Sequence, residues 1–229
     1  QFIDSSIVPI YAYLTSLVIV SLLSFLSFRF WLKKKSNGHE EANLEILKYS
    51  TIFKVSLPLM FAQSVQFLMA WTDKLMIGGM LNSEAVGIYH TAFKLSMFSA
   101  IALMSINSIA SPKFAEKFYN NDFIGLKKIS NQSTKLIFVS SIPLIILSFL
   151  FPKLLLGIFG KEFVAGTIAF LILSVGRLIS SLSGPAGNIL QMTGHQVIVQ
   201  NIMLVAAAIN VILNLLLIPV YKMEGAAIA

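Results

Sequence analysis

The chain contains no cysteine and few charged residues. Cysteine is absent from all 229 residues, which excludes a disulfide framework and a cysteine metal site. Charged residues make up 12% of the sequence, against about 25% in soluble domains, whereas hydrophobic residues make up 56%. This composition excludes a soluble globular core and is typical of a membrane protein with several spans.

Motifs for catalysis and cofactor binding are also absent. The sequence holds no GxxxxGK[ST] phosphate loop and no HExxH motif, and His39, His90 and His195 show no metal-ligand spacing. We therefore expect no enzyme activity, no cofactor and no metal. The net charge of +7 could indicate nucleic-acid binding. However, the basic residues gather at the ends of apolar runs, where membrane topology accounts for them, so we expect no nucleic-acid partner.

Six apolar runs are long enough to cross a bilayer, which takes roughly 20 helical residues. A further run begins at Gly225. The sequence therefore predicts an all-α integral membrane protein with six complete transmembrane helices and the start of a seventh. The six runs are 7–30, 56–80, 85–111, 134–152, 165–184 and 197–220.

The distribution of Lys and Arg predicts the orientation of these spans. If 29–54 lies inside the cell, then 112–135 and 185–196 lie inside as well. Together these inner segments carry eleven Lys and Arg residues, against four in the outer loops. This excess follows the positive-inside rule, so we expect the basic segments to face the cytoplasm. Within the polar stretch 36–52, Leu44, Ile46 and Leu47 indicate either a short helix on the inner surface or a solvated connector.

Polar residues recur at helical spacing within the second, third, fifth and sixth runs. A charge inside a span costs several kcal/mol unless it is paired, hydrated or able to reach the surface. Such a polar stripe must therefore meet protein or water rather than lipid. We take the following residues as candidates for lining a substrate cavity: Gln63, Gln66, Asp73, Lys94, Arg177, Asn210 and Asn214.

The charges deep in the predicted spans are mostly basic. Lys94 and Arg177 are cationic, and Asp73 is the only acid among the candidates. A cavity lined in this way would be electropositive and would suit a phosphate or pyrophosphate head group. Asp73 could in addition couple a proton or a sodium ion. Because neighbouring helical residues point about 100° apart, we expect Asp73 and Lys74 to have separate partners rather than to form one ion pair.

Each candidate also has a structural interpretation. Asn210 and Asn214 could hydrogen-bond neighbouring helices, at about 1 kcal/mol each. Arg177 could pair with an acid on another helix, and Lys94 could extend toward the outer surface. His90, near the interface, is better interpreted as a satisfied polar residue than as a ligand.

Four stretches in the same order resemble the second half of polysaccharide-export flippases, which belong to the multidrug/oligosaccharidyl-lipid/polysaccharide exporter superfamily. They are SLPLMFAQSVQFLMAWTDKLMIGGMLNSEAVGIYHTAFKL, SIASPKFAEKFYNND, GNILQMTGHQ and NVILNLLLIPVYKMEGAAIA. The resemblance covers residues 53–229. It implies a two-lobed transporter of roughly 12–14 helices, whose lobes open alternately to the two sides of the membrane around a central cavity.

On this resemblance, 1–35 is the last helix of the N-terminal lobe, 36–52 is the cytoplasmic linker between lobes, and 53–229 is a truncated C-terminal lobe. The resemblance implies a transporter in the cytoplasmic membrane that flips an anionic, lipid-linked oligosaccharide, a polysaccharide repeat unit. Its partners would be that substrate, membrane lipids and the missing N-terminal lobe. Basic side chains would hold the phosphate, while Gln and Asn contact sugar hydroxyls.

Other functions stay open on sequence alone. A multidrug or toxin efflux antiporter of the same superfamily would share the fold. A polytopic membrane scaffold without transport activity would use the polar stripes only for helix packing. A membrane glycosyl- or acyltransferase would need a catalytic His or paired acids on a loop, and the sequence shows neither.

Overall fold

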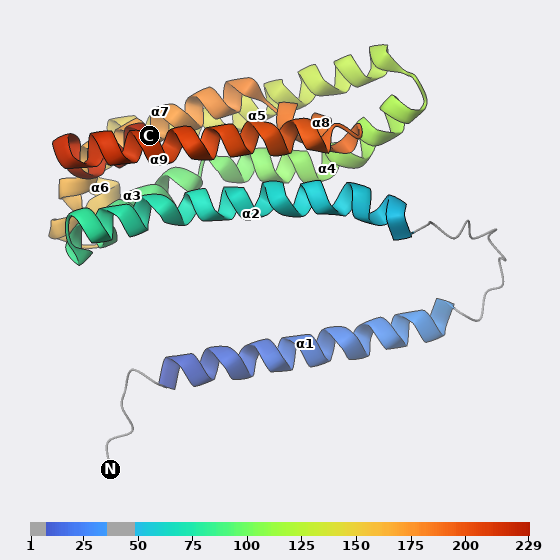
Figure 1. Cartoon of the computed structure of the whole chain (residues 1–229), viewed down its shortest axis with the longest axis horizontal. Helices are drawn as coiled ribbons and strands as arrows, with labels where there is room; N and C mark the ends of the chain where they lie inside the picture. The colour runs from blue at the N-terminus through green and yellow to red at the C-terminus, as the bar shows by residue number, and fades with distance from the viewer. Residues whose placement is uncertain (1–7, 36–48) are drawn as a thin grey trace. The chain divides into compact units, whose positions relative to one another are not determined.

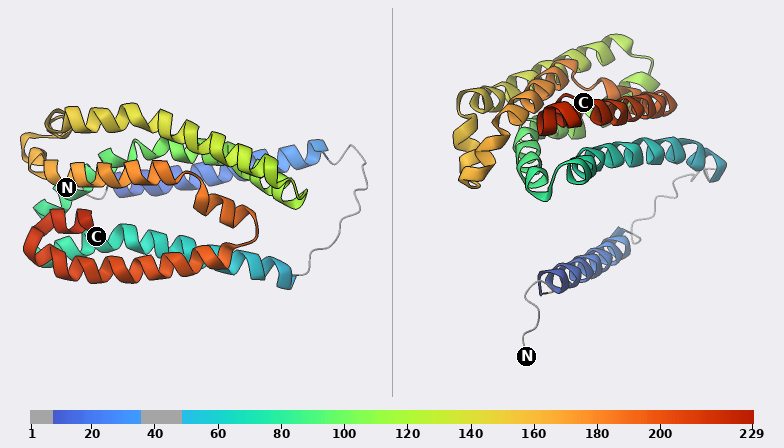
Figure 2. Two further views of the ribbon diagram at one scale, coloured as in Figure 1. Left: turned by 90° about the horizontal axis from the view of Figure 1, so that it is seen from above. Right: turned by 60° about the vertical axis from the view of Figure 1, so that its left-hand side comes forward.

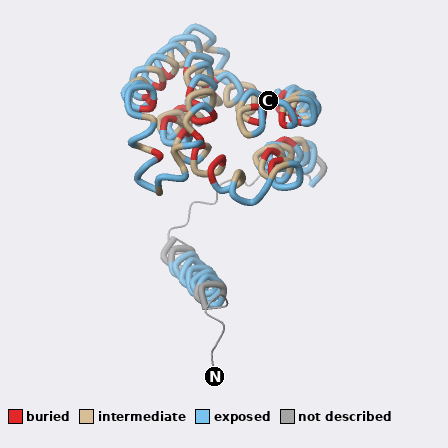
Figure 3. The backbone as a smooth tube through the Cα atoms, turned by 90° about the vertical axis from the view of Figure 1, so that its left-hand side faces the viewer, coloured by how far each residue is buried: buried red, intermediate tan, exposed pale blue. Residues whose placement is uncertain are grey.

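The computed structural model describes residues 8–35 and 49–229, and no β-strand occurs among them. The chain divides into two units, Gln1–Leu47 and Lys48–Ala229. In the first unit, α1 (Val8–Lys35) carries the apolar window Tyr13–Phe30, none of which is buried by protein (Figure 3). A helix that is apolar on every side and exposed in this way is suited to lipid. The surface helix considered around Leu44 lies outside the described residues.

The second unit is a helical bundle in which one helix, α7, joins the pair α2–α9 to the pair α4–α5. α2 and α9 lie side by side along most of their length, and α4 packs against α5 (Figures 1 and 2). α7 contacts α3, α5 and α9, so it connects the two pairs. The elements are α2 (Tyr49–Met80), α3 (Ser83–Met97), α4 (Ala100–Tyr119), α5 (Phe123–Leu150), α6 (Pro152–Gly157), the 3-10 turn η1 (Lys161–Gly166), α7 (Thr167–Ser183), α8 (Ala186–Met192) and α9 (Gln196–Ile228).

Four described helical stretches are long and apolar enough to cross a membrane, and a fifth exists if the bent pair α3–α4 is one span. The all-α membrane class is therefore confirmed, whereas the count of six spans stays a prediction. The run 56–80 lies in α2, which is 32 residues long but less apolar because Gln63, Gln66, Asp73 and Lys74 interrupt it. The four stretches are Tyr13–Phe30, Phe123–Leu150, Lys161–Ser183 and Gln196–Ile228.

The prediction of one continuous helix over 85–111 is wrong. α3 ends at Met97, α4 begins at Ala100, and the two are bent by 47°. The hydroxyl of Ser96 donates to the Phe93 carbonyl, and that of Ser99 donates to the Ser96 carbonyl, a type of bond that bends helices. The Ser99 carbonyl accepts from the Ser141 hydroxyl on α5 at 3.1 Å, so a neighbouring helix satisfies it.

The segment 153–164, which joins two of the predicted spans, is not an extended loop but forms most of α6 and η1. Part of its apolar surface joins the core: Leu156 is fully buried and packs with Ala92 and Phe170. Phe163 packs against the same cluster. An apolar stretch between two spans thus folds back into the bundle instead of extending into water.

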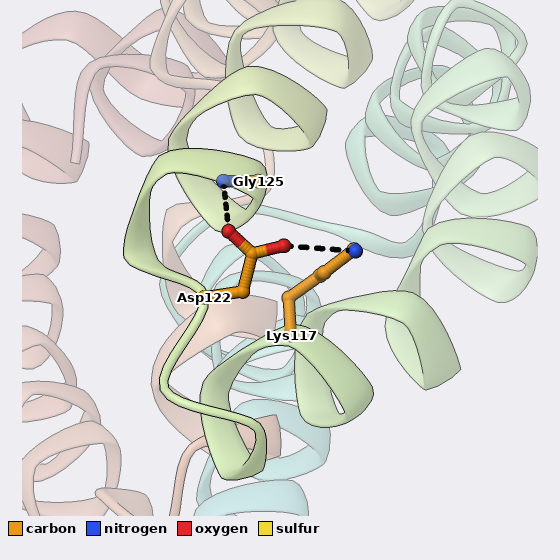
Figure 4. Close-up of polar contacts among 3 residues, drawn as sticks. All are labelled: Lys117, Asp122 and Gly125. Carbon is orange, nitrogen blue, oxygen red and sulfur yellow. Dashed lines mark hydrogen bonds and ion pairs between the residues drawn. The ribbon is translucent and has the colours of Figure 1, made fainter.

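Asn120–Asp122 forms the turn between α4 and α5, and Asp122 stabilises it. The Asp122 carboxylate accepts from the Gly125 backbone N–H at 2.8 Å and from Lys117 Nζ at 2.9 Å (Figure 4). The first contact caps the N-terminus of α5. The Lys117 ammonium and then the Gly125 amide lower the pKa of the Asp122 carboxyl, and Asp122 in turn raises the pKa of Lys117.

Acidification is expected to open this cap. Because the pKa of Asp122 is lower in the folded chain than its ordinary value of 3.8, its stabilising effect is complete above that value. The effect is lost as the pH falls through the lowered pKa. The Gly125 amide should then exchange faster with solvent, after correction for intrinsic exchange. In Lys117→Ala the onset should move up toward 3.8, because the largest cause of the shift is gone; an unchanged onset would contradict this assignment.

Two glycines at the ends of α7 permit close helix contacts. A Cβ on Gly166 would lie 2.7 Å from Ile88 Cγ2. A Cβ on Gly184 would overlap Thr134 Oγ1, and Gly184 also has a φ of +63°, which disfavours other residues.

Replacing Gly184 with alanine is expected to lower the free energy of unfolding by about 2 kcal/mol, because steric overlap adds to the unfavourable φ. Thermal unfolding in detergent measures this change. Gly176→Ala on the same helix is the matched control, because no atom lies within 4 Å of the point that its Cβ would occupy. That control should leave stability unchanged or raise it by up to about 1 kcal/mol. Equal melting temperatures for the two variants would contradict the close contact.

Candidate functional site

Asp73 lies at the centre of a buried polar group that we call the Asp73 cluster: Asp73, Tyr89, Asn210 and Asn214. One carboxylate oxygen accepts from Asn214 Nδ2 at 2.7 Å and from Asn210 Nδ2 at 3.2 Å. The other accepts from the Tyr89 hydroxyl at 3.1 Å. Asp73 is 9% exposed and Asn214 is fully buried. One carboxylate therefore ties together α2, α3 and α9.

Local sequence features bring these donors together. Asn210 and Asn214 are one helical turn apart on α9, and Asn214 Nδ2 also approaches Asn210 Oδ1 at 3.3 Å. Tyr89 follows the tight turn between α2 and α3, where the Asn82 side chain caps α3 by accepting from the Ala85 amide at 2.8 Å. This turn folds α3 back against α2, so that Tyr89 reaches Asp73.

The end of α9 closes the cluster from another side. Lys222 has non-helical backbone angles (φ 53°, ψ −132°), which reverse the chain. Ala226 then packs with Ile77, Tyr89 and Ile218, all nearly or fully buried. The Ala226 carbonyl lies 3.4 Å from the Tyr89 hydroxyl, which therefore has two acceptors for its one hydrogen.

The chemistry of the Asp73 cluster is that of a buried carboxylate held by neutral donors. Burying such a group is costly unless hydrogen bonds satisfy it, and here three donors do so. The Asn214 Oδ1 atom is buried without any hydrogen-bond partner. A carboxylate beside amide oxygens in a dry site can accept a proton or attract a small cation, and either event would change its hold on the three helices.

Two cations border this cluster and share one aromatic ring. Lys74 Nζ lies 5.2 Å and Arg177 Cζ lies 5.5 Å from the centroid of Phe93, and Lys74 Nζ is also 4.8 Å from that of Trp71. Phe93 in turn stacks on Tyr89, with 6.4 Å between ring centroids. Neither cation forms an ion pair within the described part of the chain. Aromatic rings stabilise their charges without neutralising them, so both remain able to bind an anion.

Lys94 lies apart from the Asp73 cluster, in the last turn of α3, where it is exposed. It opens on a groove of about 450 Å³ that Phe98 and Phe159 also line. His90 lines the same groove, and its buried Nδ1 has no hydrogen-bond partner. The interpretation of His90 as a satisfied polar residue is therefore wrong for this nitrogen.

The seven candidate residues thus divide into different environments. Asp73, Asn210 and Asn214 meet in one cluster, Arg177 borders it, and Lys94 faces its own groove. Gln63 and Gln66 are exposed on α2 and make no side-chain hydrogen bond with any described residue. The polar stripe predicted on α2 therefore lies partly in a buried and partly in an exposed environment.

The observed contacts test three predictions about the partners of these polar residues. Asp73 and Lys74 have separate partners, as predicted. The hydrogen bonding of Asn210 and Asn214 to a neighbouring helix is confirmed. Within the described residues Arg177 has no acidic partner, so that interpretation is wrong there.

Sequence reasoning missed Tyr89 and the role of Phe93. A usable signal was present, because a buried tyrosine hydroxyl needs a hydrogen-bond partner and Asp73 was the nearest acid in the adjacent span. Phe93 follows Tyr89 by one helical turn and so falls on the same face of α3.

Comparisons with known proteins agree on one family. The family model described as MatE matches residues 58–216. The chain is 28% identical to the capsular polysaccharide biosynthesis protein CapF of Staphylococcus aureus, over 93% of this chain and 54% of that protein. It is 23% identical to the probable low-salt glycan biosynthesis flippase Agl15 of Haloferax volcanii, over 96% of this chain and 45% of that protein.

A third relative is the teichuronic acid biosynthesis protein TuaB of Bacillus subtilis, which is 25% identical over 81% of this chain and 38% of that protein. The chain spans about half the length of the curated relatives it matches. No solved structure matches the chain significantly.

Proposed function

Because this chain belongs to the MatE family of the multidrug/oligosaccharidyl-lipid/polysaccharide exporter superfamily, we propose that it works in a transporter that flips a lipid-linked oligosaccharide across the cytoplasmic membrane. It is a multi-pass protein of the cell membrane. The names of three relatives concern capsular polysaccharide, glycan and teichuronic acid biosynthesis, and one of them is called a flippase. These names support a polysaccharide precursor as the substrate.

In this proposal the two units belong to different lobes of the transporter. Residues 1–35 are the last helix of the N-terminal lobe, 36–52 are the cytoplasmic linker, and 53–229 belong to the C-terminal lobe. The separation of Gln1–Leu47 from Lys48–Ala229 and the start of the family match at residue 58 support this division.

The observation that carries the proposal is the presence of two cations without acidic partners among the described residues, Lys74 and Arg177, beside a buried carboxylate. Within a membrane protein, such unpaired cations favour an anionic ligand. They would hold the phosphate of the substrate while its lipid tail stays in the bilayer. The exposed amides of Gln63 and Gln66 would contact sugar hydroxyls, which accept and donate hydrogen bonds.

The Asp73 cluster would couple transport to a change of conformation. Its carboxylate links α2 to α3 and α9 by accepting from one donor on α3 and two on α9. Protonation, or the arrival of a monovalent cation, would weaken or replace those contacts and shift the equilibrium between two arrangements of the helices. Alternating access requires such a shift.

Deletion of the full-length gene tests the proposal. Loss of surface polysaccharide, with lipid-linked repeat units accumulating on the inner face of the membrane, is the expected result. Intact polysaccharide with new sensitivity to cationic dyes would instead support the multidrug antiporter, and intact polysaccharide without any transport defect would support the scaffold. Complementation by the full-length gene is the control.

A further inference from the structure

Two neighbouring grooves run along α5 and have lining residues in common. The first, of about 230 Å³, lies between α4 and α5 and is lined by Ile106, Ile109, Lys113, Ser133 and others. The second, of about 410 Å³, is lined by Gln132, Lys135, Leu136 and Val139. Gln132 and Leu136 line both grooves and so form the ridge between them.

Each groove combines one lysine with apolar side chains. Lys113 belongs to the first groove and Lys135 to the second, and both lysines are exposed. Neither forms an ion pair with another described residue. The nearby acid Asp122 already binds Lys117, as Figure 4 shows, so it does not neutralise them.

Polar and apolar side chains lie next to one another in the two grooves. Lys113 and Ile129 lie toward the α4–α5 turn, whereas Lys135 and Leu136 are neighbours further along α5. Leu136 and Ile109 are 57% and 68% exposed, which leaves their apolar surface open to a ligand. A site that places cationic side chains beside exposed apolar ones matches an amphiphile with an anionic head group.

We propose that the α4–α5 grooves form a binding site for one diacyl phospholipid with an anionic head group. Lys113 and Lys135 approach the head-group phosphate from the two sides of Gln132, whose amide donates to it. The two acyl chains lie in the two grooves, one on each side of Leu136. The site is separate from the Asp73 cluster and does not depend on the transported substrate.

Selectivity in this site comes from the head group. Acyl chains gain little by leaving bulk lipid, since lipid tails are as apolar as the groove. Each lysine close to an anionic head group contributes about a fivefold preference. Two lysines therefore predict roughly a 25-fold preference for phosphatidylglycerol over phosphatidylcholine with the same chains.

Native mass spectrometry of the purified full-length protein, equilibrated with phosphatidylglycerol and phosphatidylcholine of identical chains, measures this preference. The wild type should retain phosphatidylglycerol, and the Lys113→Ala/Lys135→Ala variant should lose most of the preference. The Lys113→Arg/Lys135→Arg variant keeps both charges and should retain it. Leu136→Trp places a larger side chain between the two grooves, where it would occupy the space of the acyl chains. This variant should reduce lipid retention without any change of charge.

The matched control is Lys153→Ala/Lys161→Ala, which removes the same charge from two exposed lysines outside the grooves. This control should keep the wild-type preference. The proposal is overturned if the Lys113/Lys135 alanine variant retains the preference, or if the control loses as much. Melting temperatures of all variants show whether a loss reflects unfolding. Because the readout is lipid retention, a failure here is distinguishable from a failure of the polysaccharide assay.

Discussion

Replacing Asp73 with asparagine is expected to reduce polysaccharide export by the full-length protein more than about tenfold, while the protein still folds. The substitution keeps the size of the side chain and one acceptor oxygen for the amides of Asn210 and Asn214. It removes the charge that would take up a proton or a cation. A tenfold loss corresponds to about 1.4 kcal/mol, which is within the range that coupling between two sites provides.

The alanine variant separates coupling from packing. Asp73→Ala removes the acceptor of two buried amides and leaves the Tyr89 hydroxyl only the Ala226 carbonyl at 3.4 Å. Each unsatisfied group costs about 1–3 kcal/mol. We therefore expect Asp73→Ala to lose both stability and export, whereas Asp73→Asn loses export alone. Thermal unfolding and a surface-polysaccharide assay measure the two effects.

Glu84→Gln is the control for the loss of a negative charge. Glu84 is exposed in the first turn of α3 and makes no hydrogen bond through its side chain. This variant should export at the wild-type rate. Wild-type export by Asp73→Asn would show that the carboxylate serves packing only, and it would remove the coupling step from the proposed mechanism.

Removing the cations beside Phe93 is expected to have the second largest effect on polysaccharide export. A charge-assisted hydrogen bond to phosphate contributes about 1.5–3 kcal/mol, so Arg177→Ala should lower export at limiting substrate by roughly tenfold or more. Lys74→Ala should cause a comparable loss, because the Lys74 ammonium lies 5.2 Å from the centroid of the same Phe93 ring. The double variant should approach the phenotype of the gene deletion.

Two further variants distinguish phosphate binding from packing at Arg177. Arg177→Lys keeps the charge near Phe93 but not the planar geometry, so it should restore part of the activity. Lys127→Ala removes an exposed lysine near the α4–α5 turn and should have no effect on export. If Arg177→Ala and Lys74→Ala both leave export intact, the phosphate-holding mechanism is wrong.

Much of the fold was predictable because its cause is local. Long apolar runs must form helices in a membrane, since every backbone polar group needs a partner inside the segment. The turn at Asn120–Asp122 likewise consists of residues that favour turns and caps. The bend between α3 and α4 was not predicted. The Ser96 and Ser99 hydroxyls donate to local carbonyls there, but the Ser99 carbonyl is satisfied by a Ser141 hydroxyl that only the packing of α5 brings to it.

The sequence by itself determined the membrane class, the helices and the polar residues that they carry, because composition and helical periodicity act over neighbouring residues. Only the tertiary structure decided which polar residues meet. Asp73 and Asn214 are 141 positions apart, and their contact requires α2 and α9 to lie side by side. It also decided that Gln66 stays exposed while Asp73 is buried on the same helix. Periodicity defines the faces of a helix, but only the packing of other helices determines which face loses water and must satisfy its polar groups.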